Sequence, residues 1–260
     1  METDAITGEE NSNKERNVKS RKSEVDSLAQ ELWLGTATHN LQLPVSAPWS
    51  SVSRALNMVW RARVSYTEPL SPSHLATLAT KLPGYQQGEF LVTWDHFHGK
   101  ALPRAPFPPR TQGLSPPLYD FSFFAWFHAT MITTLDHLEG PWRKRLVEGF
   151  IDRQKAEKMV VQRPPGTFLL RFSDSQLGGV SIVCNKEGQG VSYAPFSDLH
   201  VRNIADSIFD SELTFLYPAT PVQEFQEFRS QQGAKSGSDK DGYVPRTLCR
   251  NYPKNIKDSK

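Results

Sequence analysis

The chain has 260 residues, of which 38% are hydrophobic and 22% are charged, so it is long enough for one large or two small globular domains with packed cores. It has no apolar run of the roughly 18 residues needed to span a membrane, and its N-terminus is charged where a secretory signal is apolar, so we expect an intracellular protein with no membrane partner. The formal net charge of +2 does not indicate nucleic-acid binding, and the two distant cysteines, Cys184 and Cys249, predict neither a disulfide framework nor a zinc site.

The first half of the chain has a helical pattern. Residues 1–30 contain few apolar side chains and many charges, so we expect a disordered tail there. From residue 48 to residue 141, apolar residues recur at helical spacing, which predicts a small all-helical domain. Within it, Ser71 followed by Pro72 is typical of a helix start. The proline-rich stretch near residues 105–118 predicts an exposed loop.

After Trp142 the pattern changes from helices alone to helices and strands. The segment "DRQKAEKMVV" predicts a helix capped by Asp152. Two apolar strands, "GTFLLRFS" and "GVSIVCN", follow with the turn "DSQLGG" between them, and "GQGVSYAPF" predicts a third strand. A helix with Ser197 or Asp198 as its cap is expected in "SDLHVRNIADSIF". This order predicts an antiparallel sheet with one helix on each face.

One arginine lies inside the first of these strands. In "TFLLRFS" both alternating sets of residues are largely apolar, as in a central strand that is covered on both faces, so we expect Arg171 to be partly buried. A buried guanidinium needs a carboxylate or a bound anion as its partner. An ion pair with the nearby Asp174 is one alternative, and a phosphate ligand is the other.

The surroundings of Arg171 favour phosphate. Ser173 and Ser175 offer hydroxyl groups beside the guanidinium, and the glycine pair that ends the turn leaves backbone N–H groups available. Arg153, near the start of the preceding helix, adds a second cation if that helix packs on the same face of the sheet. A planar guanidinium together with hydroxyl and backbone donors suits a phosphate dianion.

The stretch "PGTFLLRFSDSQLGGVSI" resembles the phosphate-binding strand and loop of the Src homology 2 (SH2) domain, and more narrowly that of the signal transducer and activator of transcription (STAT) family. The segments "APWSSVSRALNMVWRARV", "WDHFHGKALP", "DFSFFAWFHATM" and "GPWRKRLVEGFIDRQKAEKMV" resemble, in the same order, that family's helical linker domain and the entry to its SH2 domain. The resemblance covers roughly residues 47–250.

This resemblance implies an α+β chain, with a helical linker domain followed by an SH2 domain whose central antiparallel sheet is flanked by two helices. The implied segments are a disordered tail (1–30), a remnant of the end of a DNA-binding domain (31–47), the linker domain (48–141), the SH2 domain (142–232) and a flexible tail (233–260). The implied phosphotyrosine-binding residues are Arg171, Ser173, Asp174, Ser175 and Arg153.

The motif "DGYVP" resembles the family's activating tyrosine, so the resemblance makes Tyr243 the expected site of phosphorylation by a tyrosine kinase. It implies reciprocal exchange of this phosphotyrosine between the SH2 domains of a homodimer, or of a heterodimer with another STAT protein. It also implies binding to phosphotyrosine peptides of cytokine receptors, JAK-STAT signalling, movement from the cytoplasm to the nucleus, and regulation of transcription. No catalytic residue and no cofactor is expected.

Two alternatives to this interpretation stay open. About 47 residues precede the linker segment, too few for the family's DNA-binding domain, so we expect DNA binding only if a full domain of that kind is present. If no such domain is present, we expect the chain to act as a truncated competitor, or as an SH2 adaptor that binds phosphorylated receptors or STAT partners without binding DNA. A metal-dependent enzyme using His96 and His98 with His74 or His128 is a weaker alternative, because no acidic or cysteine partner stands at metal-ligand spacing.

Overall fold

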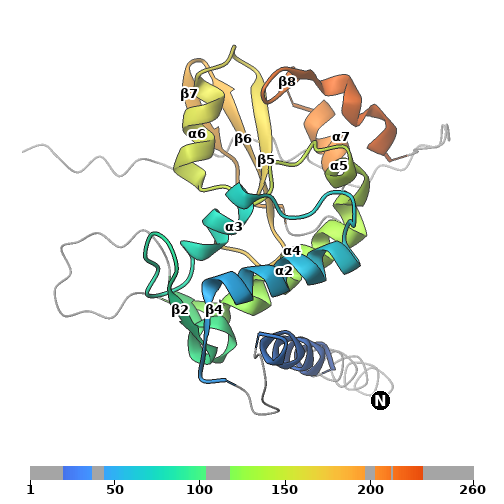
Figure 1. Ribbon diagram of the computed structural model, residues 1–260. Helices are drawn as coiled ribbons and strands as arrows, with labels where there is room; N and C mark the ends of the chain where they lie inside the picture. Colours follow the sequence, from blue (N-terminus) through green and yellow to red (C-terminus); the bar gives the residue numbers. More distant parts are fainter. Residues whose placement is uncertain (1–19, 37–43, 104–117, 197–202, 212, 231–260) are drawn as a thin grey trace, which may run out of the picture.

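The computed structural model describes residues 20–36, 44–103, 118–196, 203–211 and 213–230 (Figure 1). Tyr243 lies outside these ranges, as do Cys249, the expected caps Ser197 and Asp198, and nearly all of the proline-rich stretch. Among the described residues, no helix combines the length and the apolar character needed to cross a membrane.

Helices form most of the first half of the chain, as the apolar periodicity predicts. They are α2 (Trp49–Arg63), α3 (Pro72–Ala79), the π-helical turn η1 (Asp95–Gly99), α4 (Phe123–Thr133), the π-helical turn η2 (Thr134–Leu138) and α5 (Glu139–Arg143). Two short antiparallel pairs join them, β1 (Ser46–Pro48) with β2 (Leu91–Thr93) and β3 (Ala101–Pro103) with β4 (Leu118–Ser122). The prediction of an all-helical domain is therefore wrong. These strands were missed because segments this short carry no readable alternation of apolar and polar residues.

A five-stranded sheet forms the centre of the second half. Its elements are α6 (Arg153–Val161), β5 (Thr167–Phe172), β6 (Val180–Lys186), β7 (Gln189–Ser192), α7 (Ile204–Phe209), β8 (Phe215–Leu216), β9 (Thr220–Pro221) and the 3-10 helix η3 (Val222–Phe228). The strand order is β7-β6-β5-β8-β9, and every pair except β5 with β8 is antiparallel. The three predicted strands and their antiparallel pairing are confirmed, whereas β8 and β9 were missed because each has two residues.

Polar side chains start α3 and α6 where the sequence predicts them, whereas α7 begins later than the expected caps Ser197 and Asp198. Ser71 caps α3 with Pro72 as the first helical residue, and the Asp152 carboxylate accepts two backbone N–H groups of α6. In α7 the cap is Asn203, whose side chain accepts the N–H of Ala205 at 2.8 Å. These caps fix where the helices on either side of the sheet begin.

Strand β5 is covered on both faces, as its apolar pattern predicts, and all six of its residues are buried. One face packs against α6. The other contributes to a larger core that includes α7 and the aromatic residues of the helical half. There, the ring centroid of Phe172 lies 6.2 Å from that of Trp60 in α2 and 5.9 Å from that of Trp142 in α5. The two halves of the chain therefore share one hydrophobic core.

Residues 20–34 are helical, where the sequence predicts a disordered tail up to residue 30. Trp33 is fully buried in this helix, with its ring centroid 5.0 Å from that of Phe97 and its indole N–H donating to the carbonyl of Pro44 at 2.7 Å. Within the predicted tail itself, Leu28 and Ala29 are buried. The average composition of the tail hides this, because a helix can bury one face with an apolar residue at every third or fourth position.

Substituting Trp33 by alanine tests whether this helix is part of the folded unit. We expect Trp33→Ala to lower the free energy of unfolding by about 3–5 kcal/mol, because the change removes a fully buried aromatic side chain. The neighbouring Leu34 is exposed, so Leu34→Ala serves as the control, with a change within about 0.5 kcal/mol. Chemical denaturation measures both, and equal effects of the two substitutions would contradict the docked arrangement.

Candidate functional site

Arg171 lies near the end of β5 with 4% of its surface exposed. Its Nε–H donates to the carbonyl of Ile151 at 2.9 Å, and Nη2 donates to Oδ2 of Asp174 at 2.5 Å. The ion pair that the sequence left open is therefore present. Because Nε is already bonded to the backbone, the terminal Nη groups are the part of the guanidinium that can exchange one anion for another.

The Asp174 carboxylate binds a second cation that sequence reasoning missed. Its Oδ1 lies 3.1 Å from Nζ of Lys81, which belongs to the turn after α3 in the helical half. The side chain of Lys81 is 12% exposed and that of Asp174 is 27% exposed, so this pair is largely sheltered from solvent. No local sequence pattern points to Lys81, because the contact depends on how the two halves of the chain pack.

The two predicted hydroxyl groups occupy different positions. Ser173 is buried, and its Oγ accepts the N–H of Ser175 at 3.2 Å. Ser175 itself is exposed, and its Oγ lies 3.3 Å from that of Ser173. Ser175 is therefore the more accessible of the two serines, while Ser173 shapes the turn.

Helix α4 holds the loop that follows β5. The indole N–H of Trp126 donates to the carbonyl of Ser173 at 2.7 Å, and Oγ1 of Thr133 donates to the carbonyl of Gly178 at 2.9 Å. Gly178 has φ = +61°, and a Cβ atom there would lie 2.3 Å from Oγ1 of Thr133, so both its conformation and its surroundings require glycine. The helical half thus fixes the shape of the loop that carries Ser173, Asp174 and Ser175.

Arg153 is on the expected helix but is bound to another partner. Helix α6 packs on the face of β5 that carries Arg171, as the sequence required. The Nε of Arg153 lies 2.8 Å from Oε1 of Glu157, and the arginine side chain is 63% exposed. The same Glu157 oxygen accepts the hydroxyl of Ser192 at 2.7 Å. Arg153 would have to leave Glu157 before it could bind a ligand.

Helix α3, which leads to Lys81, is attached to the second half through His74. Its Nδ1 accepts the N–H of Ser71 at 3.2 Å, and its Nε2 lies 2.8 Å from the carbonyl of Glu148, so the imidazole is neutral with its proton on Nε2. Burial lowers the pKa of His74 below its usual value, and the bond to Glu148 offsets part of this effect. Figure 1 shows α3 between the helices of the first half and the sheet.

Two of the four histidines that suggested a metal site, His74 and His98, hold other parts of the structure together, whereas Nδ1 of His96 and Nε2 of His128 are buried without a hydrogen-bond partner among the described residues. Within the described ranges, no group of three or more His, Cys, Asp or Glu side chains could hold a metal ion. His98 lies between Oγ of Ser122 at 3.1 Å and Oδ1 of Asp26 at 2.8 Å, an arrangement of three residue types that hydrolases use. Here, however, Ser122 is the buried cap of α4 and accepts the N–H of Ala125, so its hydroxyl holds a helix end in place.

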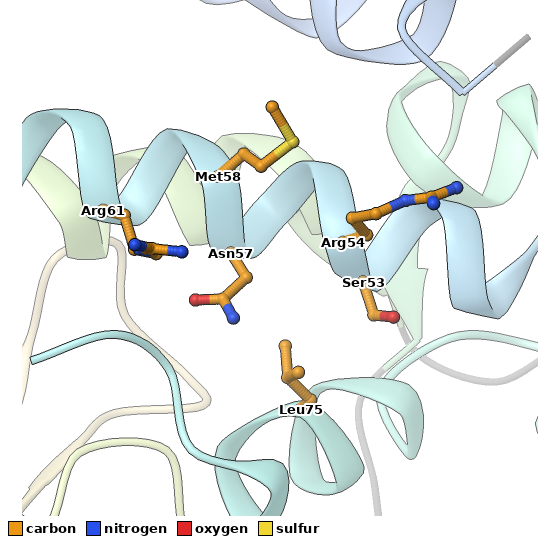
Figure 2. A pocket seen from close by; sticks show the side chains of 6 residues that line it. All are labelled: Ser53, Arg54, Asn57, Met58, Arg61 and Leu75. Atoms are coloured by element: carbon orange, nitrogen blue, oxygen red, sulfur yellow. The ribbon is translucent and has the colours of Figure 1, made fainter. Parts of the chain in front are cut away.

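A depression of about 310 Å³ lies between α2 and α3 (Figure 2). The six side chains that line it are Ser53, Arg54, Asn57, Met58, Arg61 and Leu75. Figure 2 shows Leu75 of α3 facing Ser53 and Asn57 of α2, while Met58 points away from them. None of the predicted site residues lines this depression, so it is separate from the Arg171 site.

Known families match two parts of the chain. Residues 148–208 match the SH2 domain family, and residues 37–108 match the family described as "Signal transducer and activator of transcription, linker domain". The linker match begins inside the segment expected to be a remnant of a DNA-binding domain (31–47). The SH2 match contains all five predicted phosphotyrosine-binding residues.

Two curated relatives match most of the chain. Signal transducer and activator of transcription 6 of Homo sapiens is 34% identical over 218 residues, which are 77% of this chain. Signal transducer and transcription activator of Drosophila melanogaster is 35% identical over 223 residues, which are 78% of it. The matched part spans 24% of the length of the first relative and 27% of the second.

The neutral His74 predicts a dependence of stability on pH. Because burial lowers its pKa in the folded state, the unfolded chain binds protons first as pH falls below about 6.5, and the free energy of unfolding then decreases until the folded-state pKa is reached. We expect His74→Gln to lose less stability than the wild type between pH 7.5 and pH 5.5. Chemical denaturation at both pH values measures this, and equal losses would contradict the neutral, buried imidazole. Other titrating groups, such as His128, are common to both proteins.

Proposed function

The chain contains the linker and SH2 portion of the STAT family, and we propose that it is a phosphotyrosine-binding signal transducer that dimerises by reciprocal exchange of phosphotyrosine. Arg171 is the principal ligand of the phosphate, with Ser173, Ser175 and the backbone of the loop at its side. Arg153 approaches the phosphate after leaving Glu157, and Asp174 is the carboxylate that the phosphate replaces.

The observation that carries this proposal is the buried guanidinium of Arg171 with a replaceable anion at its terminal nitrogens. The carboxylate of Asp174 is partly exposed and carries one negative charge, whereas a phosphotyrosine carries about −1.5 to −2 and three acceptor oxygens. A dianion can therefore form more charge-assisted hydrogen bonds with the same guanidinium. Nε stays bonded to the carbonyl of Ile151, so the guanidinium group is already oriented when the ligand arrives.

The ligand supplied by the chain itself is Tyr243. A Gly/Ser-rich segment of about a dozen residues separates it from the last described residue, Ser230, and such a segment spans on the order of 20 Å. When two molecules exchange these tails, the same contact forms twice around a twofold axis. Each contact then raises the effective concentration of the other, so the dimer is more stable than a single contact suggests.

The proposed partners are those that the chemistry of the site and the resemblance to the STAT family imply. We assign the chain to cytokine receptor signalling through JAK-type tyrosine kinases, with phosphotyrosine peptides of receptors and other STAT proteins as partners. It moves from the cytoplasm to the nucleus on activation and regulates transcription there. It acts by binding and not by catalysis, and contact with DNA requires a complete DNA-binding domain in the assembly.

Removing the guanidinium should abolish phosphotyrosine binding. We expect Arg171→Ala to weaken binding of the phosphorylated peptide "DGYVPRTL" by about 100-fold or more, because the buried charge partner of the phosphate is lost. Calorimetry measures the affinity, and thermal denaturation checks that the variant is folded. The exposed Arg63 of α2 provides the charge-matched control, Arg63→Ala, which should bind like the wild type. Tight binding by folded Arg171→Ala would contradict the proposal.

Phosphorylation of Tyr243 should convert monomer to dimer. Multi-angle light scattering at micromolar concentration measures the mass after treatment with a tyrosine kinase, with Tyr243→Phe as the control that stays monomeric. A monomer with confirmed phosphate on Tyr243 would rule out the exchange.

Deleting residues 239–260 separates the exchanging dimer from an adaptor. In both cases the shortened chain should still bind a receptor phosphopeptide, because the pocket is intact. If the full chain dimerises by exchange, the deletion should abolish its kinase-dependent dimerisation, whereas an adaptor has none to lose. A shortened chain that still dimerises on kinase treatment would disprove the exchange mechanism.

A further inference from the structure

Asp174 is bound by two cations that come from different domains. Its Oδ2 accepts from Nη2 of Arg171 at 2.5 Å within the SH2 domain, and its Oδ1 lies 3.1 Å from Nζ of Lys81 in the linker domain. The three groups together carry a net charge of +1. Because each cation uses a different carboxylate oxygen, one contact can break while the other remains.

The backbone around Lys81 is held in place by a hydrogen bond and by buried neighbours. The N–H of Lys81 donates to the carbonyl of Leu78 at 3.1 Å, and the flanking Leu78 and Leu82 are both buried. At the other end of α3, His74 is attached to the carbonyl of Glu148. The backbone of Lys81 therefore belongs to a turn whose helix is anchored to the SH2 domain through His74, so binding Asp174 orders the lysine side chain at little further cost in backbone entropy.

We propose that Lys81 is a positioning residue of the phosphotyrosine pocket, which holds Asp174 when the phosphate displaces this carboxylate from Arg171. This inference rests on the proposed function of Arg171. Without Lys81, a carboxylate displaced from Arg171 would be an unpaired negative charge beside the incoming phosphate. Displacement would then be less favourable, and Asp174 would compete more strongly with the phosphate for Arg171. With Lys81, the negative charge of Asp174 remains paired in both the free and the bound pocket.

A consequence is that the linker domain helps to set the affinity of the SH2 domain for phosphotyrosine. Once the phosphate has bound Arg171, Asp174 no longer shares its negative charge between two cations and pairs with Lys81 alone among the described residues. The contact between the domains then becomes stronger. By thermodynamic linkage, docking of the linker then favours phosphotyrosine binding to the same extent as phosphotyrosine binding favours docking.

A double-mutant cycle between Lys81 and Asp174 tests this role, with the phosphorylated "DGYVPRTL" peptide as the probe in calorimetry. We expect Lys81→Met to weaken binding by about 10-fold, a loss typical of breaking one partly buried charge pair, and Lys81→Arg to restore it to within about 3-fold of wild type. Asp174→Asn should bind at least as tightly as wild type, because the competitor for Arg171 is gone. In the Asp174→Asn background, Lys81→Met should change the affinity by less than about 2-fold.

Two controls accompany the cycle. Lys100→Met removes the same charge from an exposed lysine that is paired with Asp95, and it should leave the affinity unchanged. Thermal denaturation checks the folding of each variant, and Lys81→Gln replaces Lys81→Met if the latter is unfolded.

The outcomes separate this inference from the proposed function. If Arg171→Ala still binds the peptide, the proposed function itself is wrong. If Arg171→Ala abolishes binding while Lys81→Met binds like wild type, the role of Lys81 is overturned and the function of Arg171 stands. An equal loss from Lys81→Met with and without Asp174 would also overturn it, because Lys81 would then bind the phosphate directly.

Discussion

A guanidinium buried in the central strand of a sheet needs a negative partner, and the arrangement around Arg171 meets this need in a reversible way. The side chain is fixed at Nε by the carbonyl of Ile151, so its orientation does not depend on the anion. The anion at Nη2 is Asp174, which lies on a loop and is itself supported by Lys81. A partner that could not leave would neutralise the guanidinium permanently, whereas a displaceable one leaves it able to bind the phosphate that we propose as its ligand.

The loop that carries Asp174 is shaped by both halves of the chain. Trp126 and Thr133 of the helical half donate hydrogen bonds to its backbone carbonyls, and Phe172, which immediately precedes the loop, belongs to the shared aromatic core. Protein cores are close-packed and deform little, so a change in the helical half should be transmitted to this loop. The helical half is therefore a structural part of the proposed phosphate site.

The sequence predicted those features that depend on local pattern and left out those that depend on packing between distant segments. The apolar run around Arg171 predicted a central strand and a buried charge, and Asp152 marked the start of α6 through its side chain. The contact between Lys81 and Asp174 carries no local signal, because a lone lysine after a helix is usually solvated. The burial of Leu28 and Ala29 in the predicted tail was missed for the related reason that a low average hydrophobicity hides one buried helix face.

The most direct test of the central claim is a crystal structure of the chain bound to the phosphorylated "DGYVPRTL" peptide. We predict that phosphate oxygens accept hydrogen bonds from the Nη groups of Arg171, that Nε remains on the carbonyl of Ile151, and that Asp174 has left Arg171 while staying on Lys81. A phosphate bound elsewhere, with the Arg171–Asp174 pair intact, would contradict the account.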